Sequence, residues 1–254
     1  MSEQVLIDYG RMLDRLTLEA DLLVEASHHA PYDTRVPACP GLTIGEVVRH
    51  LGSVYRLVVS WLGDGRRPQE WQRDPAPGQS AEQYLLAGFD DLIRELASRD
   101  PSAPAGTWWP ADQTARFWRR RMLHETTVHR ADVQSAAGLA RTEIPADIAI
   151  DGIDEALTLW FGHRLDVLGV SGTRECSVAV RTEGHAWLAR AGPGHTEAQR
   201  SSRLNDVVAD AEVTGAPDRV YLWLWGRLAT HEVTTDGDDD AVAQLWALLR
   251  LATR

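Results

Sequence analysis

The first 137 residues alternate between long segments with helical periodicity and shorter segments that contain proline. Apolar residues recur at every third or fourth position in four segments, which cover roughly residues 3–27, 44–61, 80–96 and 113–137. Proline lacks the amide hydrogen that a helix interior needs, so the proline-containing segments between them are expected to be loops. Four amphipathic helices in succession predict a four-helix bundle, to which we assign residues 1–140.

Two of these helices are expected to begin with a capping box. In Thr43–Glu46 and in Ser80–Gln83, a hydroxyl residue is followed three positions later by Glu or Gln. At this spacing each side chain can accept a hydrogen bond from the other residue's backbone amide. The second and third helices therefore have a start signal that needs no tertiary contact.

The pattern changes after residue 145. Residues 148–168 keep a helical period, but apolar and polar residues then alternate in residues 176–181 and 186–191. Glu183–Gly184 between them predicts a β-hairpin, and residues 207–213 predict a third strand. Further helices are expected from Asp218 to Leu228 and after the acidic residues 236–240. We predict a small α+β domain with an antiparallel sheet, residues 146–254, and hence an α+β fold with two domains.

Composition restricts the kind of partner. The formal net charge of −11 argues against a nucleic acid or an anionic membrane, because both attract positive surfaces. No apolar run reaches the roughly 18–20 residues that cross a bilayer, and no signal-peptide pattern is present. Two cysteines do not predict a disulfide framework. We expect a cytoplasmic protein that acts on a small molecule and, without a heptad seam, is a monomer or weak dimer.

The fourth predicted helix places ionisable side chains on its buried face. Its inward stripe contains Trp118, Met122, Glu125 and His129 at helical spacing. A carboxylate taken out of water costs several kcal/mol, as an order of magnitude, unless a partner compensates it. His50 lies at the edge of the buried face of the second helix. We expect the partner to be a metal ion bound by His50, Glu125 and His129.

The types of ligand side chain indicate which metal would bind, and an alternative without a metal stays open. Two imidazoles and one carboxylate suit Zn²⁺ and leave a fourth position for water or substrate, although iron or nickel accepts the same ligands. Asp132, three residues after His129, can fix the tautomer of a ligand imidazole. In the alternative there is no metal, and Glu125 belongs to a buried ion-pair network with Arg121 or Arg130.

Three blocks of sequence resemble the mycothiol-dependent maleylpyruvate isomerase family. They are Val36–Thr43 with Glu46–Gly52, His124–Glu125 with His129–Asp132, and Asp210–Gly215 with Leu222–Arg227. Their order and their spread over most of the chain make the resemblance more specific than any one block. Leu42 stands where the family often has Trp, a change that affects packing more than chemistry.

The resemblance implies a DinB-like metal-binding bundle followed by a sterol-carrier-protein-like α+β domain. The zinc ligands that it implies are His50, Glu125 and His129. The residues that it places around these ligands are His124, Arg130 and Asp132. It also implies that Arg227 is the functional arginine of the C-terminal domain, where it can bind a carboxylate of the substrate or of the thiol.

The same resemblance implies a reaction. Zinc with an open position holds a thiol as the thiolate, well below its free pKa of ~8.5, and the thiol in this family is mycothiol. The thiolate would attack a small electrophile. In an isomerase it would add to the cis double bond of maleylpyruvate and leave after rotation, whereas in an S-transferase it would stay attached.

Three other features are expected to be structural. Cys39 and Cys176 are not needed for the reaction, and both are expected to be plain buried residues. The run Arg119–Arg121 is expected to form mainly a solvated helix face, with Arg121 the member nearest the site.

Two other functions stay open. The metal could activate water, which would make the protein a hydrolase. Alternatively, the chain could be a non-catalytic binding module whose α+β domain carries an apolar ligand or lipid while the metal is only structural. Turnover without a thiol would favour the first, and a bound lipid without turnover would favour the second.

Overall fold

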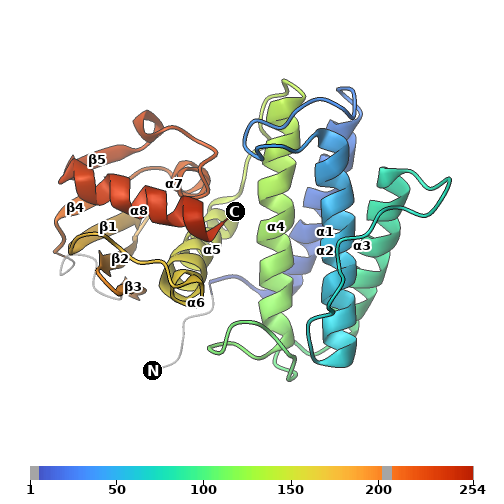
Figure 1. The fold of residues 1–254 in the computed structure, drawn as a ribbon, viewed down its shortest axis with the longest axis horizontal. Coiled ribbons are helices and arrows are strands. Elements are labelled where there is room, and N and C mark those ends of the chain that lie inside the picture. Colours follow the sequence, from blue (N-terminus) through green and yellow to red (C-terminus); the bar gives the residue numbers. More distant parts are fainter. Residues whose placement is uncertain (1–5, 202–207, 254) are drawn as a thin grey trace. The chain divides into compact units, whose positions relative to one another are not determined.

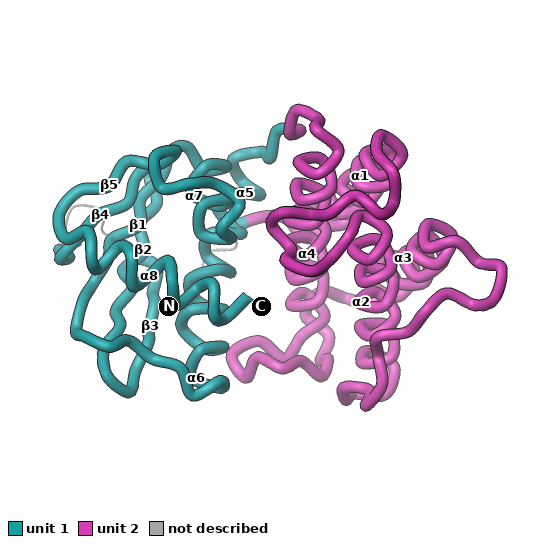
Figure 2. Tube along the Cα trace, turned by 45° about the horizontal axis from the view of Figure 1, so that its top comes forward, with its two compact units in different colours: residues 1–6, 143–254 teal, residues 7–142 magenta. Residues whose placement is uncertain are grey.

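The computed structural model describes residues 6–201 and 208–253. The chain forms two compact units, residues 7–142 and residues 1–6 with 143–254 (Figure 2). Buried apolar side chains form a core in each unit. Residues 3–5 of the first predicted helix and Val207 of the third predicted strand lie outside the described residues.

The N-terminal unit is a bundle of four helices, as the periodicity predicts (Figure 1). These helices are α1 (Tyr9–Ser27), α2 (Ile44–Asp64), α3 (Ala81–Ser98) and α4 (Ala115–Ala136). Helix α1 packs mainly on α4, and α2 packs mainly on α3. Contacts between α2 and α4 join the two pairs, so side chains from these two helices can meet inside the bundle.

Both predicted capping boxes are present. The hydroxyl of Thr43 accepts a hydrogen bond from the Glu46 amide at 3.3 Å, and the Glu46 carboxylate accepts one from the Thr43 amide at 2.7 Å. Ser80 and Gln83 make the same reciprocal pair at 3.0 Å in each direction. These bonds satisfy amides that the first turn of a helix leaves without partners, so they define where α2 and α3 begin.

Helix α4 is buried around most of its circumference. Arg119 and Arg121 are only 5% and 3% exposed, so the expectation of a solvated Arg119–Arg121 face is wrong. Arg119 donates hydrogen bonds to the carbonyls of Leu96 and Arg99 at the end of α3, at 2.7 and 2.6 Å. The last carbonyls of a helix lack intrahelical partners, and Arg119 supplies one.

Arg130 joins α4 to α1 through a fully buried ion pair. Its Nε atom donates to Glu19 at 2.6 Å, and neither side chain is exposed. The Arg130 guanidinium also donates to Gln134 at 2.8 Å and to the carbonyl of Thr142 at 2.9 Å. The buried carboxylate that Arg130 neutralises is therefore Glu19 rather than Glu125.

The C-terminal unit combines a five-stranded sheet with helices, which confirms the α+β fold class. Its helices are α5 (Ala146–Glu155), the π-helix η1 (Ala156–Arg164), α6 (Leu165–Leu168), α7 (Pro217–Leu224), the 3₁₀-helix η3 (Thr230–Glu232) and α8 (Asp239–Ala252). Its strands are β1 (Cys176–Thr182), β2 (His185–Gly192), β3 (His195–Ser201), β4 (Ala211–Thr214) and β5 (Thr234–Gly237). The strand order is β3-β2-β1-β4-β5, and both η1 and α8 pack on strands of this sheet.

The sheet is mixed, so the expectation of a purely antiparallel sheet is wrong. Strands β1 and β2 form the predicted hairpin around Glu183 and Gly184. Strand β4, however, pairs with β1 in parallel, with Val178 opposite Ala211. Strand β3 runs in the same direction as β1 on the far side of β2. Strand β4 therefore enters the sheet from the same end as β1 and does not form a hairpin with β3.

Strands β3 and β5 lie at the two edges of the sheet and were not predicted. Both are mainly polar: β3 has the sequence His-Thr-Glu-Ala-Gln-Arg-Ser, and only Thr196 in it is buried. An edge strand is held by backbone pairing on one side and can carry polar side chains. Alternation of apolar and polar residues in the sequence therefore does not reveal such strands.

The helices of this unit differ in detail from the expectation. Residues 148–168 are helical as predicted, but η1 in the middle has π geometry. Helix α7 ends at Leu224, earlier than predicted, because Gly226 adopts a left-handed conformation with φ 72°. The amides of Gly226 and Arg227 bond back to Trp223 and Leu222, the pattern of a Schellman motif. Arg227 thus follows α7 instead of lying within it.

In residues 6–201 and 208–253, no helix combines the length and the apolar character that crossing a membrane requires.

Candidate metal centre

The three predicted ligands meet inside the N-terminal unit. His50 lies on α2, and Glu125 and His129 lie one turn apart on α4. Oε1 of Glu125 is 3.3 Å from Nε2 of His50 and 3.5 Å from Nε2 of His129. The three possible ligand atoms all lie within 4.8 Å of one another. Two packed helices therefore bring two imidazoles to one carboxylate oxygen.

These separations suit a small divalent ion. With bonds of about 2.0–2.1 Å, the ligand atoms of a tetrahedral zinc site are about 3.3–3.5 Å apart. Imidazole and carboxylate are ligands that zinc accepts, and iron or nickel accepts them as well. The three side chains are 22%, 18% and 13% exposed in the order His50, Glu125, His129. The cluster is therefore partly exposed to solvent.

Arg121 pairs with the other oxygen of Glu125. Its Nη2 atom is 2.5 Å from Oε2, and its side chain is 4% exposed. Burial by itself raises the pKa of Glu125, but Arg121, with hydrogen bonds from His129 and His50, outweighs burial and holds this pKa well below its usual value. The Arg121 pair of the metal-free alternative is thus present, but it occupies Oε2, whereas Oε1 faces the imidazoles.

Once both histidines are deprotonated, the charges around the cluster suit a cation. One guanidinium, on Arg121, lies beside Glu125, and a second carboxylate, Asp132, contacts His129. With both histidines neutral, these side chains together carry a net charge of −1. Neutral imidazole is also the form whose nitrogen lone pair binds a metal. A divalent ion would therefore compensate a site of opposite charge.

Asp132 and Cys39 surround the second ring nitrogen of His129. Nδ1 of His129 is 3.1 Å from Oδ2 of Asp132, whose side chain has no exposure. The thiol of Cys39 donates to the same oxygen at 3.2 Å, and Sγ is 3.9 Å from Nδ1. Burial alone lowers the pKa of His129, but the contacts with Asp132, Cys39 and Glu125 raise it well above its usual value. Because Nδ1 faces Asp132, Nε2 is the nitrogen that faces Glu125.

The connection between α2 and α3 borders the cluster on the His50 side. The rings of Trp71 and His50 meet edge-on with centroids 5.9 Å apart, and the rings of His50 and His129 do so at 5.4 Å. The guanidinium of Arg67 lies 6.0 Å from the Trp71 ring centroid. Trp71 thus lies against His50, and Arg67 lies near the ring of Trp71.

Three further predicted residues have other surroundings. His124 is fully buried on α4, and successive residues of a helix point about 100° apart, so its side chain leaves the helix in a different direction from Glu125. Arg130 pairs with Glu19, as described above. Arg227 belongs to the C-terminal unit, where its Nη1 atom donates to the carbonyl of Trp225 at 2.6 Å.

The contact of Cys39 with the site was missed by sequence reasoning. Cys39 was expected to be a plain buried residue, but it is half-buried and bonded to Asp132. These two residues are 93 positions apart in the chain. The available signal was weak: Cys39 stands in a proline-flanked loop that leads into the helix carrying His50.

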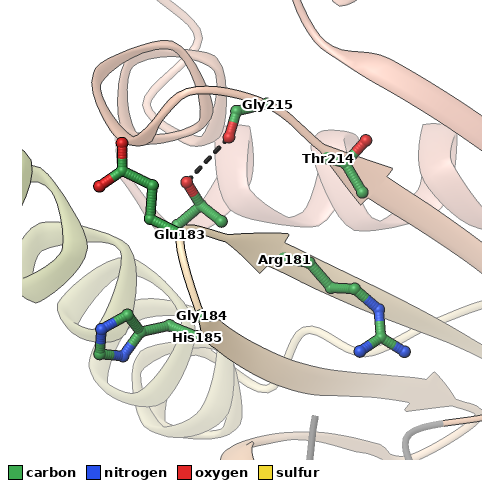
Figure 3. A pocket seen from close by; sticks show the side chains of 7 residues that line it. Arg181, Glu183, Gly184, His185, Thr214 and Gly215 are labelled. Atoms are coloured by element: carbon green, nitrogen blue, oxygen red, sulfur yellow. Dashed lines mark hydrogen bonds between the residues drawn. The ribbon is translucent and has the colours of Figure 1, made fainter. Parts of the chain in front are cut away.

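The C-terminal unit has an open cavity of about 370 Å³ beside the β1–β2 turn (Figure 3). Its lining includes Arg181, Glu183 and His185, and Thr182 donates a hydrogen bond to the carbonyl of Gly215 at its rim, at 2.8 Å. Arg227 is not among the lining residues.

Comparison with known proteins finds one matching domain profile and two similar crystal structures. Residues 13–134 match the profile of the mycothiol maleylpyruvate isomerase N-terminal domain. This range includes His50, Glu125 and His129. Two similar crystal structures are those of the mycothiol-dependent maleylpyruvate isomerase, with 14% identity and a TM-score of 0.56, and of a histidine-to-alanine mutant of it, with 13% identity and a TM-score of 0.59. Each comparison covers 91% of this chain and 95% of the other. No curated protein sequence matches the chain.

The profile match and the two similar crystal structures support different conclusions. At 13–14% identity the two crystal structures show a shared fold, and the coverage extends that fold over both units. The profile match concerns the sequence of the helical bundle itself, including α2 and most of α4. Residues 13–134, which form the helical bundle, therefore match the mycothiol maleylpyruvate isomerase N-terminal domain.

Proposed function

We propose that this protein is a metal-dependent enzyme that activates the thiol of mycothiol for attack on a small electrophile. The metal is zinc, bound by His50, Glu125 and His129. The reaction is the cis–trans isomerisation of maleylpyruvate or a close analogue, or transfer of the thiol to the electrophile. The match of residues 13–134 to the mycothiol maleylpyruvate isomerase N-terminal domain and the names of the two similar crystal structures support mycothiol and maleylpyruvate as the first compounds to test.

The observation that carries this proposal is the convergence of three metal-binding side chains at one carboxylate oxygen. The separations of 3.3 and 3.5 Å from Oε1 of Glu125 to the two Nε2 atoms are those of ligands around one small ion. When bound, such an ion lowers the pKa of a thiol, so that the thiolate is available at neutral pH.

The chain's own side chains have separate roles in this proposal. Arg121 holds Glu125 in place through Oε2. Asp132 keeps the proton of His129 at Nδ1, which leaves the lone pair of Nε2 for the site. Arg227 binds a carboxylate of the substrate or of the thiol, since a guanidinium pairs with a carboxylate in a bidentate manner.

The experiment combines metal analysis with a thiol-dependent assay. The purified protein is analysed for bound metal and then incubated with mycothiol and either maleylpyruvate or monobromobimane. We expect about one zinc ion per chain, and turnover that requires the thiol, disappears on chelation and returns with zinc. Isomerisation without net consumption of mycothiol identifies an isomerase, and an adduct with bimane alone identifies an S-transferase.

Two outcomes would replace the proposal. Turnover that does not need a thiol would indicate a metal-dependent hydrolase. A co-purified apolar ligand, together with no turnover of either electrophile, would indicate a binding module in which the metal only stabilises the bundle.

A further inference from the structure

Cys39 occupies a fixed position beside the candidate metal centre. It lies in the connection between α1 and α2, where its amide donates to the carbonyl of Val36 at 3.0 Å and its carbonyl accepts from the amide of Leu42 at 2.9 Å. The amide of Val36 in turn donates to the carbonyl of Leu42 at 3.0 Å. This closed set of backbone bonds directly precedes the capping box of Thr43, so the thiol is held at the start of the helix that carries His50.

The thiol meets a carboxylate that is completely buried. Sγ of Cys39 donates to Oδ2 of Asp132 at 3.2 Å, and the same oxygen is 3.1 Å from Nδ1 of His129. An ionised carboxylate only accepts hydrogen bonds, and a buried one needs donors with defined directions. Two donors from different elements thus converge on one oxygen: the thiol from the α1–α2 connection and the imidazole from α4.

From this geometry we propose that Cys39 is a positioning residue, which acts through Asp132 on His129. The S–H group fixes the direction of the Asp132 carboxylate, and the carboxylate holds the Nδ1 proton of His129. The imidazole then presents Nε2 toward Glu125. This inference rests on the proposed metal site for its consequence, tighter metal binding, but the hydrogen-bonded chain itself can be measured without a metal.

A direct metal-binding role of Cys39 is the competing interpretation. Cys39, His129 and Asp132 also have possible ligand atoms within 4.8 Å of one another. An ion bound there would have to displace the proton from Nδ1 of His129 and would remove its hydrogen bond to Asp132. The positioning role keeps this hydrogen bond and uses the sulfur only as a donor, so the two interpretations predict different spectra.

The test is a double-mutant cycle on the full chain. Zinc dissociation constants are measured by competition with a chromophoric chelator for the wild type, Cys39→Ala, Cys39→Ser, Asp132→Asn and the Cys39→Ala/Asp132→Asn double variant. We expect Asp132→Asn to weaken zinc binding by about 10- to 100-fold, the range for such supporting residues. Cys39→Ala should weaken it by about 3- to 10-fold, as expected for loss of one hydrogen bond, and Cys39→Ser, which keeps a donor, should stay within about twofold of the wild type.

The cycle shows whether Cys39 acts through Asp132. In the Asp132→Asn background, Cys39→Ala should have no further effect on zinc binding, because the carboxylate that it positions is already absent. Cys176→Ala is the matched control, since Cys176 is the other cysteine of the chain and lies in strand β1. It should bind zinc as the wild type does.

A second readout uses the metal-free protein. The exchange of the His129 Nδ1 proton with water, followed by NMR, should be faster in Cys39→Ala and Asp132→Asn and unchanged in Cys39→Ser. If wild-type protein binds no zinc, the proposed function fails, while this measurement still decides the role of Cys39.

Three results would overturn the inference. The first is an equal loss of affinity from Cys39→Ala with and without Asp132. The second is a thiolate-to-metal charge-transfer band in the cobalt-substituted protein that disappears in Cys39→Ala, because it would make Cys39 a ligand. The third is an unchanged Nδ1 proton exchange rate in Cys39→Ala.

Discussion

Arg121 and Glu125 lie one turn apart on α4, and Nη2 of Arg121 donates a hydrogen bond to Oε2 of Glu125 at 2.5 Å. The two oxygens of the Glu125 carboxylate therefore lie in different environments. Oε2 faces a buried guanidinium, whereas Oε1 faces the imidazoles of His50 and His129. A carboxylate held in this way keeps its charge and its direction, and both are needed for binding a metal.

Replacing Arg121 by Met should destabilise the metal-free protein. The change leaves Glu125 without its guanidinium partner, and breaking a buried pair in this way costs about 3 kcal/mol. We expect saturating zinc to recover part of this loss, because the ion supplies a new positive partner. Urea unfolding with and without zinc measures both effects. Arg94→Met is the control, because Arg94 pairs with Asp91 at an exposed position and should change stability by less than about 0.5 kcal/mol. Equal effects of the two substitutions would contradict the assigned role of Arg121.

Replacing His50 by Ala should remove most of the bound metal. Without His50 the site retains Glu125 and His129, both on α4, and loses the ligand that comes from α2. Zinc content after dialysis, measured by mass spectrometry, should fall well below that of the wild type. His28→Ala is the matched control, because His28 pairs with Glu82 at the surface of the same bundle. Full zinc occupancy in His50→Ala would rule out the ligand assignment.

Zinc affinity should increase with pH. The contacts with Asp132, Cys39 and Glu125 raise the pKa of His129 well above 6.5, so the metal-free protein retains a proton there that the metal must displace. The zinc dissociation constant should therefore fall by up to about tenfold per pH unit above pH 6.5, until His129 deprotonates. The lowered pKa of Glu125 keeps this residue ionised over the same range. A dissociation constant that does not change with pH would contradict this.

The same shifts determine how the metal-free protein responds to pH. A raised pKa means that the contribution of His129 to stability is complete below its unfolded pKa and is lost as pH rises through the folded value. A lowered pKa means that the contribution of Glu125 is complete above its unfolded pKa and is lost as pH falls through the folded value. Urea unfolding of the chelator-treated protein should thus show the two contributions at opposite ends of the pH range.

The substitution Glu19→Gln should destabilise the bundle without changing the metal site. Glu19 and Arg130 are both fully buried, so removing the charge of Glu19 leaves the guanidinium uncompensated, at a cost of about 3–5 kcal/mol. Chemical denaturation measures the loss, and zinc titration of the folded variant should give a dissociation constant within about twofold of the wild type. A large change in zinc affinity with no change in stability would mean that this pair belongs to the metal site instead.

The sequence by itself determined the features that depend on neighbours along the chain. The capping boxes of Thr43 and Ser80, the turn at Glu183–Gly184 and the four-helix periodicity each arise from contacts within a few residues. The placement of Glu125 and His129 on one face of a helix also follows from their spacing. These features could be predicted because their geometry is set by the local backbone.

Only the tertiary structure decided which groups meet across the chain. It paired Arg130 with Glu19, buried Arg119 and placed the thiol of Cys39 beside Asp132. It also placed β4 parallel to β1 and used polar segments as edge strands. These pairings depend on how helices and strands pack at long sequence separation, where many partners are chemically equivalent and only the folded geometry selects one.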